Sequence, residues 1–238
     1  MRAIEKSFFA PTNRMLSVLS SAELGRLAPH LRRVKLKENQ ILFDVEDDVR
    51  QVHFVETGVV TLISMTDEGD SIEVGIVGFE GVVGVPSILR CRRAPFRAQV
   101  QIAGEAFALD GSTLCQEFKK GGSLQEVILC FTHTLVAQCA HSITCNHFHT
   151  VDKRLARWLL MTRDRVRGNA FHLTHKLLSD MLGTSRSDVT RAAGELQKAG
   201  IIDYRRGNIT ILNDDKLESA ACACYRSMQE ELEMFLEA

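Results

Sequence analysis

The sequence predicts an α+β fold in three parts: an amino-terminal jelly-roll β-barrel, a long dimerisation helix and a carboxy-terminal winged helix-turn-helix. Three observations lead to this prediction. Short β-branched runs recur about every ten residues in the first half, a long helical repeat follows, and two capped helices then precede two short β runs. We expect the barrel in residues 1–122, the helix and a hinge in 123–150, and the winged helix-turn-helix with a final helix in 151–238.

The composition is that of an ordinary globular chain. Of 238 residues, 45% are hydrophobic and 25% are charged. No wholly apolar run is long enough to cross a membrane, and Met1 to Lys6 lack the apolar core of a signal peptide. The seven cysteines are expected to be reduced thiols. These features predict a cytoplasmic protein without a membrane partner.

The net charge of −1 would by itself argue against a polyanionic partner. However, residues 151–212 contain 12 Lys+Arg and 6 Asp+Glu, which gives this segment a charge of +6. The residues before it carry −2 and those after it −5. Since the charge of a segment is what a polyanion meets, a nucleic-acid partner remains open for the basic segment.

The first half predicts a barrel of short strands. Residues 56–58 and 66–70 have the composition of turns, and we expect no helix within residues 34–110. A jelly roll can also be a metal-dependent enzyme with a cluster of histidines, but only His30 and His53 precede residue 130. The sequence also has no nucleophile elbow, P-loop or paired-glycine nucleotide-binding motif. We therefore do not expect an enzyme. The predicted strands are residues 40–44, 52–56, 59–65, 71–77 and 98–102.

A heptad repeat predicts the long helix. Ser123 could cap it, and a 4-3 spacing then runs for three repeats. We interpret this stripe as a dimer seam; the alternative is a face that packs the helix on its own barrel. A second helix is predicted at 151–165, with the junction near 146–151. The stripe consists of Leu124, Ile128, Phe131, Leu135, Gln138, Ser142 and Cys145.

The segment 173–212 has the pattern of a winged helix-turn-helix. Thr174 can cap a helix that ends at Leu182, and Gly183 suits the left-handed turn residue. Ser185 can cap a second helix over 186–199. Two β runs, 201–205 and 209–212, follow as a wing, joined by Arg206, Gly207 and Asn208.

Polar side chains lie on the second helix opposite its apolar positions. Arg186, Ser187, Thr190 and Arg191 are of the types that bond guanine edges or phosphates. The alternative is a helical hairpin with a solvated basic face. The wing, the caps and the charge of +6 together favour double-stranded DNA as the partner.

These motifs resemble a known family. Residues 182–191 (LGTSRSDVTR) and 195–212 closely resemble the winged helix-turn-helix of the Crp/Fnr transcription regulators. Residues 54–60 (FVETGVV) and 78–84 (GFEGVVG) resemble the cyclic-nucleotide-binding-type barrel of the same family. The resemblance implies a homodimer that binds an inverted-repeat operator and that would contact RNA polymerase if it activates transcription.

The resemblance also implies roles for individual residues. Arg186, Ser187 and Arg191 fall where the family reads bases. Ser187 departs from the glutamate of the best-known members, which implies a different operator at that base pair. The positions where the family holds phosphates are Thr174, Thr184, Ser185 and Thr190, with Arg206 and Asn208 in the wing.

The effector of the barrel is not evident from the sequence. Cyclic-nucleotide binders of the family use a Gly-Glu pair and an Arg-Ser pair, where this chain has Gly84-Val85 and Arg97-Ala98. Valine and alanine cannot bond a ribose hydroxyl or a phosphate, which disfavours cyclic AMP. The first cysteine is Cys91, so the amino-terminal iron–sulfur cluster of the oxygen-sensing branch is not expected.

Two further interpretations stay open. His141, Cys145 and His149 recur every fourth residue, and Cys222 and Cys224 could fold back from a later helix to complete a metal or redox site. We expect no metal there, because Cys-x-Cys on a helix points its sulfurs about 200° apart. The other interpretation is a barrel that binds proteins, with a vestigial DNA-binding part, which the intact arginines and wing disfavour.

Overall fold

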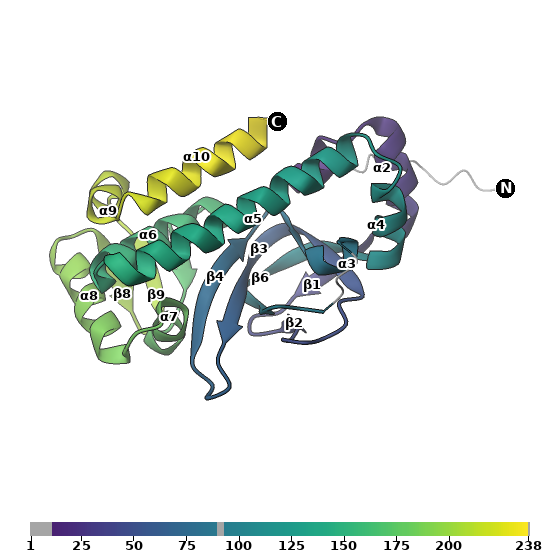
Figure 1. Ribbon diagram of the computed structural model, residues 1–238. Coiled ribbons are helices and arrows are strands. Elements are labelled where there is room, and N and C mark those ends of the chain that lie inside the picture. Colours follow the sequence, from purple (N-terminus) through teal and green to yellow (C-terminus); the bar gives the residue numbers. More distant parts are fainter. Residues whose placement is uncertain (1–10, 90–92, 238) are drawn as a thin grey trace.

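The computed structural model describes residues 11–89 and 93–237. The expectation of no signal peptide rests on Met1 to Lys6, and that of no amino-terminal iron–sulfur cluster rests on Cys91. These residues lie outside the described ones. Figure 1 shows a curved sheet, helix α5 (Ser123–Phe148) lying across it, and a small mixed unit at the carboxy-terminal end of α5. The predicted α+β architecture is confirmed.

The barrel is one antiparallel sheet of six strands. The strand order is β1-β6-β3-β4, while β2 pairs with β6 and β5 pairs with β3. Its interior is filled by aliphatic and aromatic side chains such as Val52, Phe54 and Leu109, all at most 1% exposed. The strands are β1 (Arg32–Leu36), β2 (Ile41–Phe43), β3 (Gln51–Met65), β4 (Ser71–Val77), β5 (Val82–Val83) and β6 (Arg97–Asp110).

Two expectations for the barrel are wrong. The predicted turn at 56–58 lies inside the continuous strand β3, where the pairing with β6 shifts register between Val55 and Val60. Gly58 absorbs the shift at φ +84°, and a Cβ there would lie 2.5 Å from the carbonyl oxygen of Ile102. A one-turn helix, α3 (Val85–Ile88), also interrupts the region where no helix was expected.

Short helices flank the barrel. Asn13 caps α1 (Arg14–Ser17), and a reciprocal capping box of Ser20 and Glu23 begins α2 (Ser21–Leu27). The helix α4 (Gly111–Phe118) begins at the Asp110 cap. The 3₁₀ turn η1 (Ala28–His30) links α2 to β1.

The predicted dimer seam of α5 faces its own barrel instead. Leu124, Ile128 and Phe131 are at most 1% exposed and belong to the barrel core. Gln138 accepts a hydrogen bond of 3.1 Å from the backbone of Ile76 in β4. The prediction is wrong because an apolar helix stripe can pack against a sheet as well as against a partner helix. The alternative interpretation, in which the stripe packs the helix on its own barrel, holds.

The opposite face of α5 is exposed and partly apolar. Leu129, Val136 and Ile143 are 49%, 64% and 70% exposed and lie seven residues apart. By length and composition α5 would suffice to cross a membrane, with a mean hydropathy of 1.3, which the expectation from apolar runs did not foresee. The same composition arises in a helix that covers a core on one side and a partner on the other.

Helix α6 (Val151–Val166) ties the winged unit to the barrel. The indole of Trp158 donates a 2.9 Å hydrogen bond to Glu73 of β4. Arg165 forms a 2.8 Å ion pair with Glu80, with side chains 4% and 1% exposed. Since both pairs are buried between the two parts, they hold α6 in one position on the sheet.

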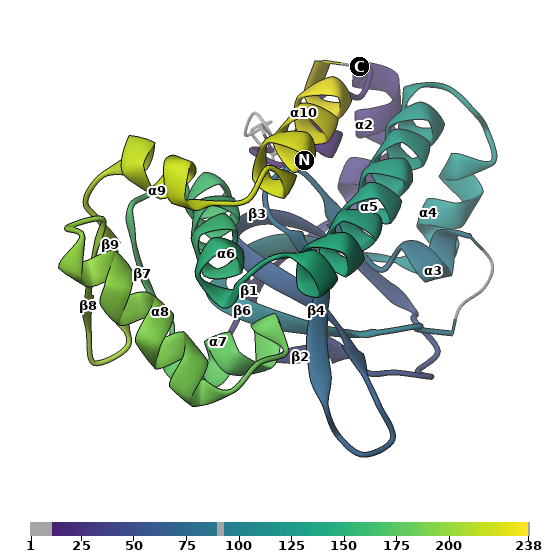
Figure 2. The same cartoon turned by 60° about the vertical axis from the view of Figure 1, so that its left-hand side comes forward.

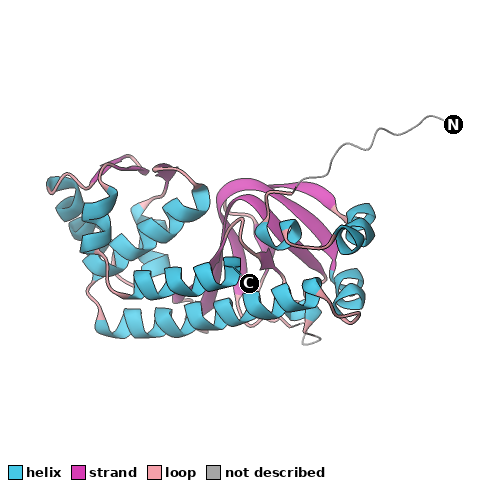
Figure 3. Ribbon diagram, turned by 90° about the horizontal axis from the view of Figure 1, so that it is seen from above, coloured by secondary structure: helices cyan, strands magenta, loops and turns pink. Residues whose placement is uncertain are grey.

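The carboxy-terminal unit contains the predicted two helices and wing. Its three-stranded sheet has the order β7-β9-β8. Helix α10 returns beside α5, as Figures 2 and 3 show from two sides. The elements are β7 (Ala170–His172), α7 (His175–Leu182), α8 (Arg186–Lys198), β8 (Ile202–Arg205), β9 (Asn208–Ile211), α9 (Asp214–Ala220) and α10 (Cys224–Glu237).

Candidate nucleic-acid interface

The turn between α7 and α8 is built by caps. Thr174 accepts from the backbone of Leu177 at 3.3 Å, and Ser185 accepts from that of Asp188 at 3.1 Å. Gly183 ends α7 in the left-handed conformation, at φ +54°. The sequence therefore fixes both the end of α7 and the start of α8 locally.

Helix α8 buries one face and exposes the other. Val189 and Ala192 are fully buried against the unit's core. Arg186, Ser187 and Arg191, the predicted base-reading residues, are all exposed on α8. The guanidinium of Arg186 makes no hydrogen bond or ion pair with another described residue, which leaves its donors available to a ligand.

Arg191 is held by carboxylates that sequence reasoning missed. Its guanidinium lies 3.2 Å from Asp152 of α6, 3.4 Å from Glu195 and 4.0 Å from Asp188. The charge of Asp152, with those of Glu195 and Asp188, raises the pKa of Arg191. The side chain is 51% exposed, so water screens these pairs and a DNA base could displace them. The i,i+3 spacing to Asp188 and the i,i+4 spacing to Glu195 follow from a helix pattern, whereas the contact with Asp152 of α6 does not.

A pair of stacked rings, His175 and Tyr204, contacts α8 through Thr190. The rings of His175 and Tyr204 are stacked at 4.4 Å, and the Nδ1 of His175 lies 2.9 Å from the hydroxyl of Thr190. Burial, helped by the charge of Arg186, lowers the pKa of His175. This contact joins α7, α8 and the wing, and no sequence spacing signalled it.

The predicted phosphate-contacting hydroxyls are partly occupied within the chain. Thr190 donates to the backbone oxygen of Arg186 at 2.8 Å. Thr184 donates to Asp188 at 3.4 Å, and Ser185 donates to the same carboxylate at 2.6 Å. Thr174, Ser185 and Thr190 remain exposed, whereas Thr184 is half-buried.

The wing is a tight hairpin between β8 and β9. Arg206 and Gly207 have φ of +51° and +86°, as a two-residue type I′ turn requires. Asn208 lies 3.2 Å from the Nδ1 of His172 through its side-chain oxygen. The side chains of Arg205 and Arg206 are exposed at the tip.

The four candidate effector residues do not present free ligating groups. Arg97 is held by Asp44 through bonds of 3.0 and 2.6 Å, and this pair lowers the pKa of Asp44. Ala98 is fully buried in the core. Gly84, at φ +113°, and Val85 form the start of α3, where a Cβ on Gly84 would lie 2.7 Å from the backbone oxygen of Gln51.

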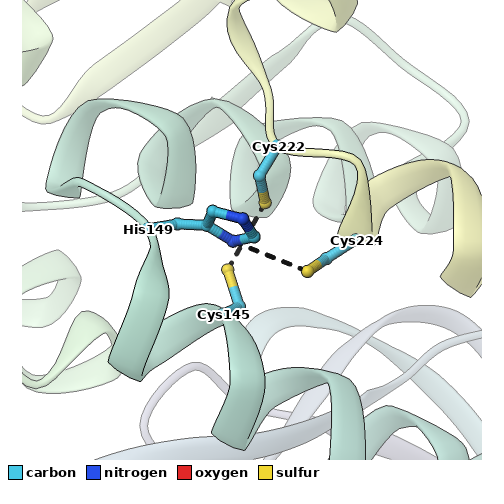
Figure 4. Close-up of side chains that lie close together, drawn as sticks. All are labelled: Cys145, His149, Cys222 and Cys224. Carbon is cyan, nitrogen blue, oxygen red and sulfur yellow. Dashed lines mark hydrogen bonds between the residues drawn. The ribbon is translucent and has the colours of Figure 1, made fainter.

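The cysteine and histidine candidates converge, with one exception. Figure 4 shows the side chains of Cys145, His149, Cys222 and Cys224 close together. Their ligand atoms lie within 4.8 Å of one another, and His141 is not among them. The expectation that the sulfurs of Cys222 and Cys224 diverge is wrong, because Cys222 precedes α10 and only Cys224 lies in it. The Cys-x-Cys segment is thus a helix start.

Comparisons with known proteins agree with this geometry. Residues 153–220 match the family described as the Crp-like helix-turn-helix domain. The chain is 22% identical to the Global nitrogen regulator of Synechococcus elongatus, over 86% of this chain and 95% of the relative. It is 24% identical to the Fumarate and nitrate reduction regulatory protein of Vibrio cholerae, over 85% and 84%.

A solved structure shares the fold over most of the chain. FixK2 from Bradyrhizobium japonicum superposes with a TM-score of 0.70 at 17% identity, over 81% of this chain and 98% of that one. Together with the helix-turn-helix match and the curated relatives, this defines the class: a DNA-binding transcription regulator rather than an enzyme. The chain is similar to regulators of the Crp/Fnr family, and its residues 153–220 match the helix-turn-helix domain of that family.

Proposed function

We propose that the chain acts as a homodimer on an inverted-repeat operator, with the α8 of each copy in a major groove. The observation that carries this proposal is the exposed face of α8, where Arg186, Ser187 and Arg191 stand together at the amino-terminal half of the helix. Recognition helices of the helix-turn-helix type contact base edges with such amino-terminal residues. The wing tip, with Arg205 and Arg206, is suited to the flanking backbone.

The exposed face of α5 supports the homodimer. Its exposed residues follow the 4-3 spacing of a coiled-coil seam, with apolar side chains at alternate seam positions and a small alanine between two of them. A second copy of the same helix presents the same face, which a two-fold axis requires. The seam consists of Leu129, His133, Val136, Ala140, Ile143 and His147.

The residues of the barrel disfavour cyclic AMP as the effector of this regulator. The pairing of Arg97 with Asp44 leaves the guanidinium engaged, and Ala98 offers no hydroxyl. A cyclic phosphate would therefore lose the partners that the family's nucleotide binders supply. Calorimetric titration with cyclic AMP and cyclic GMP should show no micromolar binding.

Selection of bound fragments from random duplex DNA tests the proposal. We expect an enriched inverted repeat whose half-sites lie about 34 Å apart, bound by two chains per duplex. Enrichment of sequences with a single half-site, bound by one chain, would contradict the dimer. Enrichment of no sequence would contradict base reading by α8.

A further inference from the structure

The structure assigns a metal site to the group of Cys145, His149, Cys222 and Cys224, and we propose that it binds one zinc ion. The site lies apart from the DNA-binding face, between the carboxy-terminal end of α5 and the α9–α10 connection. Neither the barrel nor the recognition helix contributes a ligand. The proposal therefore does not depend on the proposed operator or on the dimer.

The donor set is that of a structural zinc site. Three cysteines and one histidine supply three sulfurs and one nitrogen, and sites with four protein ligands are closed to substrate. The cysteines are buried, at 0%, 5% and 7% exposed, and form a small group separate from the two larger cores. His149 is half-buried and closes the fourth side.

The distances fit a single tetrahedral ion. Bonds of about 2.3 Å to sulfur and about 2.0 Å to nitrogen place two sulfurs about 3.8 Å apart and a sulfur and a nitrogen about 3.5 Å apart. The Sγ atoms of Cys145 and Cys222 are separated by 3.4 Å, and the Sγ of Cys224 lies 3.6 Å from the Nδ1 of His149. Because the four ligand atoms lie within 4.8 Å of one another, they can surround one ion. They leave no room for a cluster of irons and sulfides.

The backbone brings these ligands together without strain. Cys145 lies in the last turn of α5, and His149 follows the helix in an extended conformation, while its N–H still donates to the oxygen of Cys145 at 3.1 Å. The extended backbone at His149 turns its ring back toward the thiols. Cys222 and Cys224 stand on the two sides of the turn that begins α10, and the N–H of Tyr225 donates to the oxygen of Cys222 at 3.0 Å.

Two buried arginines next to the group point to a negatively charged centre. Arg157 is 4% exposed, its NH1 contacts only the sulfurs of Met161 and Met228 at 3.2 and 3.3 Å, and its Nε has no hydrogen-bond partner among the described residues. Its charge interacts with all three thiols of the group.

The second arginine is Arg154, which is 7% exposed, donates to the backbone oxygen of Leu182, and also has an Nε without a partner in the described part of the chain. Its charge interacts with Cys145 and Cys222. A zinc ion with three thiolates and a neutral imidazole carries a net charge of −1. Such a centre would add negative charge beside the two guanidinium groups, of which that of Arg157 also acts on the buried carboxyl of Glu73.

Zinc in this position would clamp α5 to the tail of the DNA-binding unit. Two of the ligands come from the end of α5 and two from the connection between α9 and α10. Both α9 and α10 pack against α6, the first helix after α5. An occupied site would therefore limit rotation of the winged unit about Thr150, the N-cap of α6.

Metal analysis of the full-length chain, purified without a histidine tag or chelator and under reducing conditions, tests the proposal. We expect about one zinc per chain. Cys145→Ser and Cys222→Ser should bring the zinc content close to zero, whereas Cys139→Ser, on the same helix but outside the group, should leave it unchanged. His141→Ala is the matching control for His149→Ala.

Cobalt added to metal-stripped wild-type protein provides a readout that needs no variant to fold. We expect the visible absorption of tetrahedral cobalt bound to thiolates, at a ratio of about one per chain. Absence of both zinc and this absorption would overturn the proposal. So would bound iron with a cluster absorption, or a disulfide between Cys145 and Cys222 in metal-free protein isolated under reducing conditions.

Discussion

At the scale of single residues, Glu73 is the buried titratable group with the clearest pH consequence. Burial raises the pKa of its carboxyl to about 7, although the hydrogen bond from Trp158 and the charges of Arg157 and Arg165 act in the opposite direction. The folded-state pKa thus lies above the unfolded value of 4.5. The stability that Glu73 contributes is complete below pH 4.5 and is lost as the pH rises through about 7.

Glu73→Gln keeps a side-chain oxygen for Trp158 and removes this titration. We expect the variant to match the wild type in unfolding free energy near pH 4.5 and to exceed it by about 3 kcal/mol at about pH 8. Urea unfolding at both pH values measures the difference. Glu68→Gln, in the exposed β3–β4 turn, is the control. A constant difference at both pH values would contradict the assigned titration.

Arg191 is the residue through which base reading is tested. We expect Arg191→Ala to weaken binding to the selected operator by about 10- to 100-fold and to relax the preference at one base pair. Competition titrations with operators changed at single positions measure both effects. Arg206→Ala, at the wing tip, should instead weaken binding to all sequences similarly and reduce the salt slope by about one. Equal losses on all sequences for Arg191→Ala would sink the assignment.

At the scale of elements, the two faces of α5 show how far the sequence could be interpreted. The heptad stripe correctly predicted a long helix, but not what that stripe contacts, because Leu124, Ile128 and Phe131 pack on the barrel. A repeat of apolar residues predicts that one face of a helix is buried, but it does not predict which element covers that face. The exposed face, with Leu129, Val136 and Ile143, was less evident because a histidine and an alanine separate its apolar residues.

A charge on that exposed face tests the dimer. We expect Val136→Glu to raise the dimer dissociation constant by about 100-fold or more, because a carboxylate would be buried in the seam. Sedimentation equilibrium over a range of protein concentrations measures it. Thr144→Glu, which adds the same charge at the flank of the seam, should have a much smaller effect. An unchanged association of Val136→Glu would place the interface elsewhere.

Other elements were predicted to different degrees. The helix-turn-helix and wing agree with their predicted residues within one or two positions, since caps and a glycine turn act locally. The turn expected at 56–58 became a bulge in β3, because pairing with β6 outweighs the local preference of Gly58. The sequence pattern predicts that both cysteines of the Cys-x-Cys segment lie on a helix, whereas Cys222 lies before α10. A shift of two residues in the helix start decides whether the two sulfurs converge.

At the scale of the whole molecule, contacts far apart in the sequence fix how the parts sit together. The pairs Arg165–Glu80 and Trp158–Glu73 hold α6 on the barrel, and Asp152 reaches Arg191 from α6. None of these contacts follows from spacing, since each joins residues at least 39 positions apart. The sequence could therefore predict the parts and their order, but not how α6 connects them.

Charge at this scale also has a consequence for DNA binding. The chain carries −1 overall, while its basic segment 151–212 carries +6. We infer that general attraction to DNA is weak and is confined to the winged unit, which leaves more of the affinity to base contacts. Affinity for the operator should thus depend on the spacing of its half-sites as well as on their sequence.

Equilibrium titration of the full-length protein with three duplexes tests this most directly. The first carries the selected inverted repeat, the second one half-site, and the third both half-sites moved apart by about half a helical turn. We predict tight binding to the first duplex only, with the second and third bound equally and much more weakly. Equal affinity for all three would contradict a two-fold symmetric dimer that reads both half-sites through α8.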